Sequence, residues 1–194
     1  MMHARVWTVL IVTIHLCLQI AASLPTNPTT TYEFIETSCS NTTYPDLCLN
    51  TLSPYADSIG SDNWKLCTAA LNATISSSRV VASTISKIAR KKGISKMEAA
   101  IVADCIENIR DSIDEMKQSL KAINRIKNRK DRAFQMDNIK TWMSAAITDD
   151  GTCTDGFAGT KMSNAVKAKI GRCVVNIGRL TSNALSLINH LEYY

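Results

Sequence analysis

The sequence predicts an all-α protein, an up-down-up-down four-helix bundle preceded by an N-terminal helical hairpin. Three observations lead to this prediction. Apolar residues recur at helical spacing along four long segments within residues 61–192. Short segments containing turn formers separate them. No run of alternating polar and apolar residues, and no hairpin turn signal, indicates a β-strand.

Residues 1–23 have the pattern of a cleaved secretory signal. A weakly basic start precedes a mostly apolar stretch over residues 6–20, and small residues follow at 21–23. Polar residues interrupt the apolar stretch, which argues against a membrane span. We therefore expect a secreted, extracellular protein. Residues 24–31 are rich in Pro and Thr and predict a flexible lead-in, and residues 32–194 predict one domain.

Residues 32–54 predict the helical hairpin. Two short helical segments flank a turn around Pro45, because proline cannot occupy a helix interior. Cys39 and Cys48 lie too far apart to pair along one helix, but folding at Pro45 brings them together. A disulfide between them suits an oxidising compartment.

The first two long helices have the clearest boundary in the chain. The first begins near Trp64 and is followed by a basic turn and by Gly93, which closes it. Ser95 and Glu98 have the spacing of a capping box and open the second helix. The second helix has an apolar face that includes Ile101, Val102, Cys105, Ile106, Ile109, Ile113, Met116, Leu120 and Ile123.

The third and fourth helices follow the same pattern. The third is expected from about Asp131, and the run Asp149, Asp150, Gly151 is expected to stop it, with Gly151 left-handed. Its expected inward residues are Phe134, Ile139, Trp142, Met143 and Ala146. The fourth begins after a loop at 156–159. Two glycines at 171 and 178 inside it should each cost about 1 kcal/mol, for which close approach of a neighbouring helix would compensate.

The cysteines indicate disulfides rather than a metal site. Cys17 leaves with the signal, and the remaining six form no C-x-x-C pair, which disfavours zinc. A bond between Cys105 and Cys153 would join the second helix to the end of the third. Cys67 and Cys173 can form a third bond or remain two buried thiols that pack as small hydrophobic groups.

Composition and motifs argue against catalysis. His190 is the one histidine left after the signal, and no Ser–His or Cys–His pair, metal cluster or phosphate loop can be assembled. We expect a non-enzymatic protein without a cofactor. The formal charge of +5 is mild apart from a basic run at 127–132 without interleaved aromatics, so nucleic acid is not expected. That run indicates a solvated connection or, alternatively, weak adhesion to an acidic polymer.

A row of carboxylates is the most informative surface feature. Glu107, Asp111 and Asp114 share one helical face, away from the isoleucines. The row can be a solvated stripe supported by neighbouring basic residues. It can also be a polar docking surface, because a bond between the second and third helices would hold Thr152 and Asp155 beside it.

Two asparagines are acceptors for N-glycosylation, Asn41 in NTT and Asn72 in NAT, whereas Pro28 excludes Asn27. Either site can stay empty. Asn72 lies opposite the apolar stripe of its helix, so a sugar there would not disturb the core.

Four segments together resemble the plant invertase and pectin methylesterase inhibitors, over about residues 37–191. The segment from Cys39 to Cys48 is similar to that family's first cysteine pair, and residues 104–114 are similar to the segment around its third cysteine. Residues 142–157, which read WMSAAITDDGTCTDGF, look like its most distinctive stretch, and residues 180–185 look like its closing helix.

The resemblance implies a disulfide-stapled four-helix bundle with bonds 39–48 and 105–153. It also implies a protein that binds a secreted carbohydrate-active enzyme one-to-one and occludes its substrate cleft. The pectin methylesterase branch is closer, because the acidic residues after the third cysteine match that branch and a Pro-Lys-Phe loop of some invertase inhibitors is absent. The residues that the resemblance places at the interface are Glu107, Asp111, Asp114, Ser144, Thr152 and Asp155.

Two alternatives remain open at the level of sequence. Within the family, the target can be an acid invertase, in the cell wall or the vacuole. From a different class, the protein can be a non-inhibitory cell-wall module that binds acidic pectin through residues 127–132.

Overall fold

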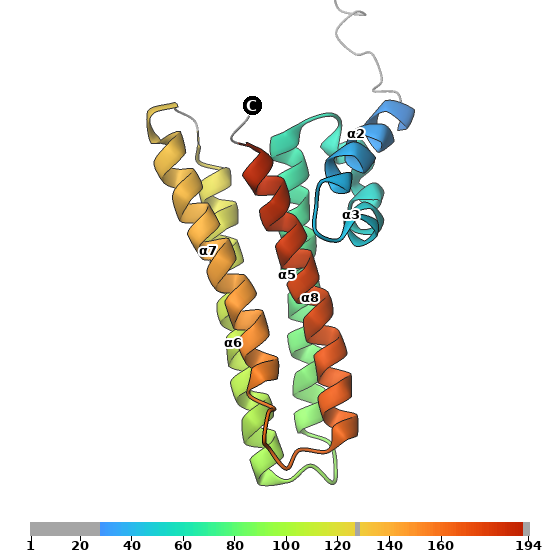
Figure 1. Ribbon diagram of the computed structural model, residues 1–194, viewed down its shortest axis with the longest axis vertical. Helices are drawn as coiled ribbons and strands as arrows, with labels where there is room; N and C mark the ends of the chain where they lie inside the picture. Colours follow the sequence, from blue (N-terminus) through green and yellow to red (C-terminus); the bar gives the residue numbers. More distant parts are fainter. Residues whose placement is uncertain (1–27, 127–128, 192–194) are drawn as a thin grey trace, which may run out of the picture.

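The computed structural model describes residues 28–126 and 129–191, and every regular element in these ranges is helical (Figure 1). The four long helices are α5 (Asn63–Ala89), α6 (Lys96–Ile123), α7 (Arg129–Asp155) and α8 (Asn164–His190). Each packs against the next in the chain, and α8 packs back on α5, so the predicted up-down-up-down order is confirmed. None of these described helices has the length and hydropathy needed to cross a membrane. The predicted signal, residues 1–23, lies outside the described residues.

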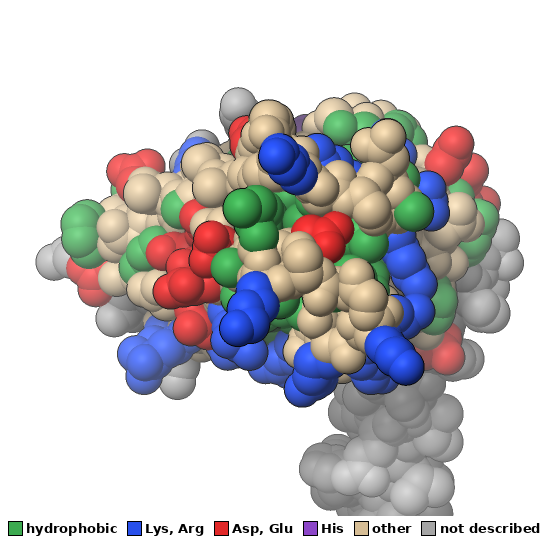
Figure 2. Space-filling view, turned by 90° about the horizontal axis from the view of Figure 1, so that it is seen from below, with side chains coloured by type: hydrophobic (Ala, Val, Ile, Leu, Met, Phe, Trp, Pro, Cys, Tyr) green, Lys and Arg blue, Asp and Glu red, His purple; other side chains and the backbone are tan. Residues whose placement is uncertain are grey.

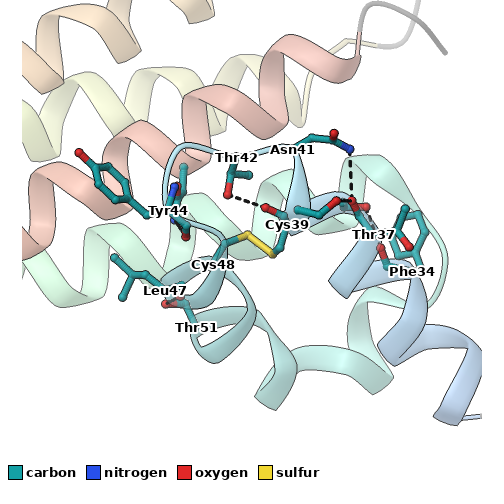
Figure 3. The surroundings of a disulfide bond; sticks show 12 residues. Phe34, Thr37, Cys39, Asn41, Thr42, Tyr44, Leu47, Cys48 and Thr51 are labelled. Atoms are coloured by element: carbon teal, nitrogen blue, oxygen red, sulfur yellow. Dashed lines mark hydrogen bonds between the residues drawn. A yellow bond between two sulfur atoms is a disulfide. The ribbon is translucent and has the colours of Figure 1, made fainter.

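Four shorter helices precede the bundle. They are α2 (Pro28–Ser40), α3 (Pro45–Leu52), the 3-10 helix η1 (Ser53–Tyr55) and α4 (Ala56–Ile59). The pair α2–α3 forms the predicted hairpin beside one end of the bundle, against α5 and α8 (Figure 1). Cys39 and Cys48 are joined across this hairpin, with their Cα atoms 5.5 Å apart (Figure 3).

The prediction of a flexible lead-in over residues 24–31 is wrong for residues 28–31, which form the first turn of α2. Thr31 is only 2% exposed and packs against the rest of the protein, whereas Thr30 is exposed. Burial of Thr31 offsets the low helix propensity of this segment. Residues 24–27 lie outside the described part of the chain.

A buried asparagine attaches the hairpin to the bundle. The backbone N–H of Tyr44 donates to Asn183 Oδ1, and Asn183 Nδ2 donates to the Tyr44 carbonyl, both at 2.9 Å. The amide thus pairs with both backbone groups of one residue, as a residue of a neighbouring antiparallel strand would. The guanidinium of Arg179 lies 5.2 Å from the centre of the Tyr44 ring and adds a cation–π contact.

Polar side chains fix the starts of the long helices. Asp62 accepts from the backbone N–H groups of Trp64 and Lys65 at the start of α5. The predicted capping box of Ser95 and Glu98 is present at the start of α6. The other Glu98 oxygen accepts from the N–H of Ser163, 2.9 Å away, at the start of α8. Backbone hydrogen bonds from Ser95 and then Ser163 lower the pKa of Glu98.

Each long helix contributes side chains that are fully buried in one core, among them Ile85, Ile109, Met143 and Ile177. In α7 the buried residues Met136, Ile139 and Met143 recur at spacings of three and four. Phe134, which was expected to face inward, is 66% exposed. It lies two residues before Met136, and therefore on the opposite side of the helix.

The predicted end of the third helix at residues 149–151 is also wrong. Helix α7 continues to Asp155, and Gly151 is not among the residues with positive φ. The reason is tertiary packing, because Ala146, Asp150 and Cys153 are all buried and extend the inward stripe of α7 by two turns. The left-handed glycine comes later, at Gly159, where φ is +68°.

Close helix packing does not explain both glycines of α8. A Cβ atom at Gly178 would lie in ordinary contact, 3.8 Å from the Asp150 Cβ. A Cβ atom at Gly171 would have no neighbour within 4 Å. The predicted close approach is therefore wrong for Gly171, and at Gly178 the neighbouring helix also leaves room for a Cβ atom.

We expect Gly171→Ala to raise the free energy of unfolding by roughly 0.5–1 kcal/mol, because alanine reduces the entropy of the unfolded chain and meets no obstacle in α8. Urea unfolding at neutral pH measures this change. Gly159→Ala is the matched control and should be destabilising, since φ at that position is +68°. Equal effects at the two positions would contradict the prediction.

The two remaining cysteines are not bonded. Cys67 and Cys173 are both free, so the alternative of a third disulfide is not realised. Burial, and to a smaller extent the charge of Asp62, raises the pKa of the Cys67 thiol to about 12. Cys173 is half-buried, because the inward position of this turn is the next residue, Val174, at 2% exposure.

Candidate functional site

The carboxylate row that the sequence indicates lies on the outer face of α6. Glu107, Asp111 and Asp114 are exposed, whereas Ile109 and Ile113 on the same helix are buried. Helical periodicity places these two sets on opposite sides of α6. The row therefore offers its charges to solvent or to a partner.

Helix α7 carries a row of hydroxyl groups on its outer face. Ser144, Thr148 and Thr152 are exposed and four residues apart. The hydroxyl of Thr148 donates to the Ser144 carbonyl at 3.0 Å, and that of Thr152 donates to the Thr148 carbonyl at 2.9 Å. Asp155, also exposed, ends the helix three residues later. Thr148 was not among the predicted site residues, although its spacing from the other two could have indicated it.

A buried disulfide holds these two helices together. Cys105 on α6 and Cys153 on α7 are each 1% exposed and their Cα atoms lie 4.1 Å apart. This bond fixes α6 and α7 near the end of the bundle that Figure 2 shows. In that view Asp and Glu side chains gather on the side where α6 and α7 lie, while Lys and Arg side chains occupy much of the rest of the rim.

Four carboxylates form an acidic patch where α6 meets α7, which we call the acidic seam: Asp111, Asp114, Glu115 and Asp149. Burial raises the pKa of Glu115, and the charges of Asp149, Asp111 and Asp114 raise it further. Burial, and then the charge of Asp111, raises the pKa of Asp149. Lys117 forms an exposed ion pair of 2.8 Å with Asp114 on the same helix. The seam therefore gathers four carboxylates, of which Asp114 is paired with Lys117.

The structure brings some of the predicted site residues into this seam and leaves others beside it. Asp111 and Asp114 belong to the seam, whereas the other predicted positions, Glu107, Ser144, Thr152 and Asp155, are exposed on the same two helices. Glu115 and Asp149 were not predicted. Both are half-buried, and one Glu115 oxygen has no hydrogen-bond partner among the described residues. The four-residue spacing from Asp111 to Glu115 was the available signal.

A buried carboxyl group lies behind the seam. Asp150 is 2% exposed and accepts a hydrogen bond from the hydroxyl of Thr181 on α8 at 3.0 Å. Its other oxygen, Oδ1, has no hydrogen-bond partner among the described residues. Burial raises the pKa of Asp150 to about 6, although the nearby hydroxyls of Thr181 and Ser112 oppose the shift. The hydrogen bond between Asp150 and Thr181 links α7 to α8 on the buried side of the site.

The site is an open surface of exposed carboxylates and hydroxyls. In the described ranges, no group of three or more His, Cys, Asp or Glu residues is placed to hold a metal ion. His190 is exposed, and its Nδ1 atom lies 2.7 Å from the Ser186 carbonyl. Exposed carboxylates and hydroxyls on two fixed helices can accept hydrogen bonds and attract cationic groups of a partner.

The remaining predicted sites lie elsewhere. Asn41, in the turn of the hairpin, and Asn72, on α5, are both exposed, and their side-chain amides donate to the carbonyls of Thr37 and Thr68. Figure 3 shows Asn41 at the hairpin turn. The basic run at 127–132 lies partly outside the described residues. Its last member, Arg132, donates to the Leu191 carbonyl at 2.9 Å and lies over the Trp64 ring.

Comparison with known proteins identifies the family. The family model described as "Plant invertase/pectin methylesterase inhibitor" matches residues 33–187. Pectinesterase inhibitor 11 of Arabidopsis thaliana is 40% identical over 159 residues, which are 80% of this chain and 79% of that protein. Pectinesterase inhibitor 10 of the same plant is 42% identical over 162 residues, 82% of this chain but only 51% of that protein, so this chain spans about half of its length.

A solved structure supports the fold independently. A crystal structure of a mutant pectin methylesterase inhibitor from Arabidopsis superposes with a TM-score of 0.61 over 80% of this chain and 95% of that chain, at 16% identity. At 16% identity this match is evidence for the fold alone, whereas the family model and the relatives are evidence for common ancestry. The chain belongs to the plant invertase/pectin methylesterase inhibitor family.

Proposed function

We propose that this chain is a secreted, non-enzymatic inhibitor of pectin methylesterase that acts in the cell wall. It binds the esterase one-to-one and blocks the substrate cleft, and thereby regulates pectin de-methylesterification. The names of its relatives support the target, since proteins at 40% and 42% identity are called pectinesterase inhibitors. The signal pattern of residues 1–23 supports secretion.

The observation that carries the proposal is the outer face of α6 and α7. There the acidic seam lies beside the hydroxyl row, and the Cys105–Cys153 bond fixes the two helices to each other. A face built on two long, disulfide-linked helices is already in its binding geometry, so little conformational entropy is lost on association. An interface of standard size, roughly 1,600 Å² in total, would cover it.

The proposed mechanism is competitive occlusion. The inhibitor lays the α6–α7 face over the mouth of the cleft, so that the polymer and the inhibitor exclude each other. Exposed carboxylates such as Asp111 and Asp114 gain hydrogen bonds from donors of the esterase. The half-buried position of Asp149 strengthens such bonds, because it lowers the local dielectric around the carboxylate.

Reversing the charge of the carboxylate row should weaken inhibition. We expect the double variant Asp111→Lys, Asp114→Lys to raise the inhibition constant against plant pectin methylesterase at least about tenfold, because it places two cations where the esterase meets two anions. Titration of esterase activity with the purified variant measures the change. Helical content should be unchanged, since both positions are exposed.

The matched control reverses two acidic residues elsewhere. Glu33→Lys, Glu36→Lys makes the same change in net charge at two exposed positions of α2. This variant should inhibit as the unmodified protein does. If both double variants lose inhibition equally, a general effect of charge is responsible and the assignment of the α6–α7 face is wrong.

The two alternatives predict different outcomes in a parallel assay against esterase and acid invertase. The family description includes invertase inhibitors, so inhibition of invertase alone would promote that target. The pectin-binding alternative relies on residues 127–132, of which Arg132 already contacts Trp64 and the end of α8. Retention on de-esterified pectin that fades steeply with salt, without inhibition of either enzyme, would favour it.

A further inference from the structure

A groove that the inhibitory mechanism does not use lies away from the acidic seam, at the end of the bundle that is uppermost in Figure 1. It has a volume of about 570 Å³ and lies between the start of α5 and the end of α6. That volume is within the range of small-molecule sites. The residues that define its character are Tyr55, Ser58, Trp64, Thr68, Asn72 and Asn124.

The lining has the chemistry of a carbohydrate site. Tyr55 and Trp64 both line the groove; Tyr55 is 44% exposed, and Trp64 is half-buried with the Arg132 guanidinium 5.0 Å from the centre of its ring. Aromatic rings pack well against the apolar C–H face of a pyranose, and their amphipathic character suits a contact that stays partly wet. The amide of Asn124 and the hydroxyl of Ser58 supply hydrogen-bond partners for sugar hydroxyls and acetamido groups.

One lining residue is itself an acceptor for N-glycosylation. Asn72 belongs to the sequon Asn72-Ala73-Thr74 and is exposed. Its Nδ2 atom donates to the carbonyl of Thr68, one turn back along α5, at 3.0 Å. Side chains of a helix lean towards its N-terminus, which is where Tyr55 and Trp64 lie. The atom that would carry a sugar is therefore held over the groove.

We propose that an N-glycan carried by Asn72 folds back into this groove, with its first two N-acetylglucosamine residues against Tyr55 and Trp64. The amide nitrogen has two N–H groups, so it can lose one to the sugar and still donate the other to Thr68. Transfer forms the bond from Nδ2 to C1 of the first sugar. It breaks the bond from C1 to the oxygen of a lipid-linked diphosphate donor, and the amide proton leaves with the diphosphate.

The docked sugar would shield surface that the protein alone leaves open. Ile126 also lines the groove and is only partly buried. Covering this patch stabilises the end of the bundle where α5 begins and α6 ends. The other sequon serves as an internal comparison, because Asn41 lies in the hairpin turn and does not line this groove. The proposal rests on the secretion proposed above and not on inhibition of any enzyme.

The test uses the mature chain, residues 24–194, secreted from plant cells and also refolded from bacteria without glycans. Asn41→Gln leaves only the Asn72 site, and Asn72→Gln leaves only the Asn41 site. Mass spectrometry of the secreted Asn41→Gln protein should find a glycan on Asn72. Its Tm should exceed that of the bacterial Asn41→Gln protein by roughly 3 °C or more, whereas the two forms of Asn72→Gln should agree more closely.

A groove contact, rather than a general effect of an attached sugar, is tested by Tyr55→Ala in the Asn41→Gln background. This exposed residue can be truncated without opening the core, and the variant should lose most of the Tm gain from the glycan. A second measurement is acrylamide quenching of Trp64 fluorescence in a Trp142→Phe background, which the glycan should reduce. The proposal would be overturned if Asn72 carries no glycan. It would also be overturned if the glycan still raises Tm fully in the Tyr55→Ala variant and does not change the quenching of Trp64 fluorescence.

Discussion

Removal of the Cys105–Cys153 disulfide, as Cys105→Ala, Cys153→Ala, should cost about 4 kcal/mol of unfolding free energy and lower Tm by about 10 °C. The bond closes a loop with a sequence separation of 48, so its loss returns much entropy to the unfolded chain. Inhibition should weaken as well, by tenfold or more, because the acidic seam and the hydroxyl row would no longer be fixed to each other. Urea unfolding and esterase titration of the same protein measure both effects.

The Cys39–Cys48 disulfide is a control that distinguishes the effect on stability from the effect on inhibition. Cys39→Ala, Cys48→Ala opens a loop with a sequence separation of 9, and the expected loss is about 2.5 kcal/mol. That bond lies in the α2–α3 hairpin, away from the α6–α7 face (Figures 1 and 3). Inhibition by this variant should be retained below its Tm. If the Cys105–Cys153 variant also inhibits normally while folded, the fixed α6–α7 face is not what the esterase recognises.

The fold could be predicted because its determinants are local. Helical periodicity, the capping box of Ser95 and Glu98 and the break before Pro45 each act within a few residues, and the structure contains all of them, with the turn at residues 41–44 and Pro45 as the first residue of α3. The end of α7 could not be predicted in this way. The run from Asp149 to Gly151 has the composition of a helix stop, but Asp150 is buried against Thr181 of α8, thirty-one residues away in the chain.

The candidate site was predictable to a smaller degree. The carboxylates of Asp111 and Asp114 could be found, because an exposed helical face depends only on spacing along one helix. Glu115 could have been found by the same spacing, whereas Asp149 joins the seam only because α6 and α7 pack side by side. The pairing of Asn183 with the backbone of Tyr44 is a contact across 139 positions, for which neither local segment carries a signal.

Asp150 makes stability depend on pH, and the sign follows from its raised pKa. Burial raises the pKa to about 6 from an unfolded value of 3.8, so the folded state binds its proton more tightly than the unfolded chain does. The group therefore favours folding most below pH 4. This contribution to the unfolding free energy declines as the pH rises from about 4 to about 6. Above pH 6 the whole contribution, roughly 3 kcal/mol, has been lost.

Asp150→Asn should remove this dependence, because the amide is neutral at every pH and keeps an oxygen that can accept from Thr181. The variant and the unmodified protein should have similar unfolding free energies at pH 4, while at pH 7 the variant should be more stable by up to about 3 kcal/mol. Urea unfolding at both pH values measures the difference. Asp149 and Glu115 also have raised pKa values, but their contributions are largely shared by the two proteins and cancel in the comparison. An equal difference at pH 4 and pH 7 would show that Asp150 does not change its protonation in this range, and the buried carboxyl would then act only through its hydrogen bond to α8.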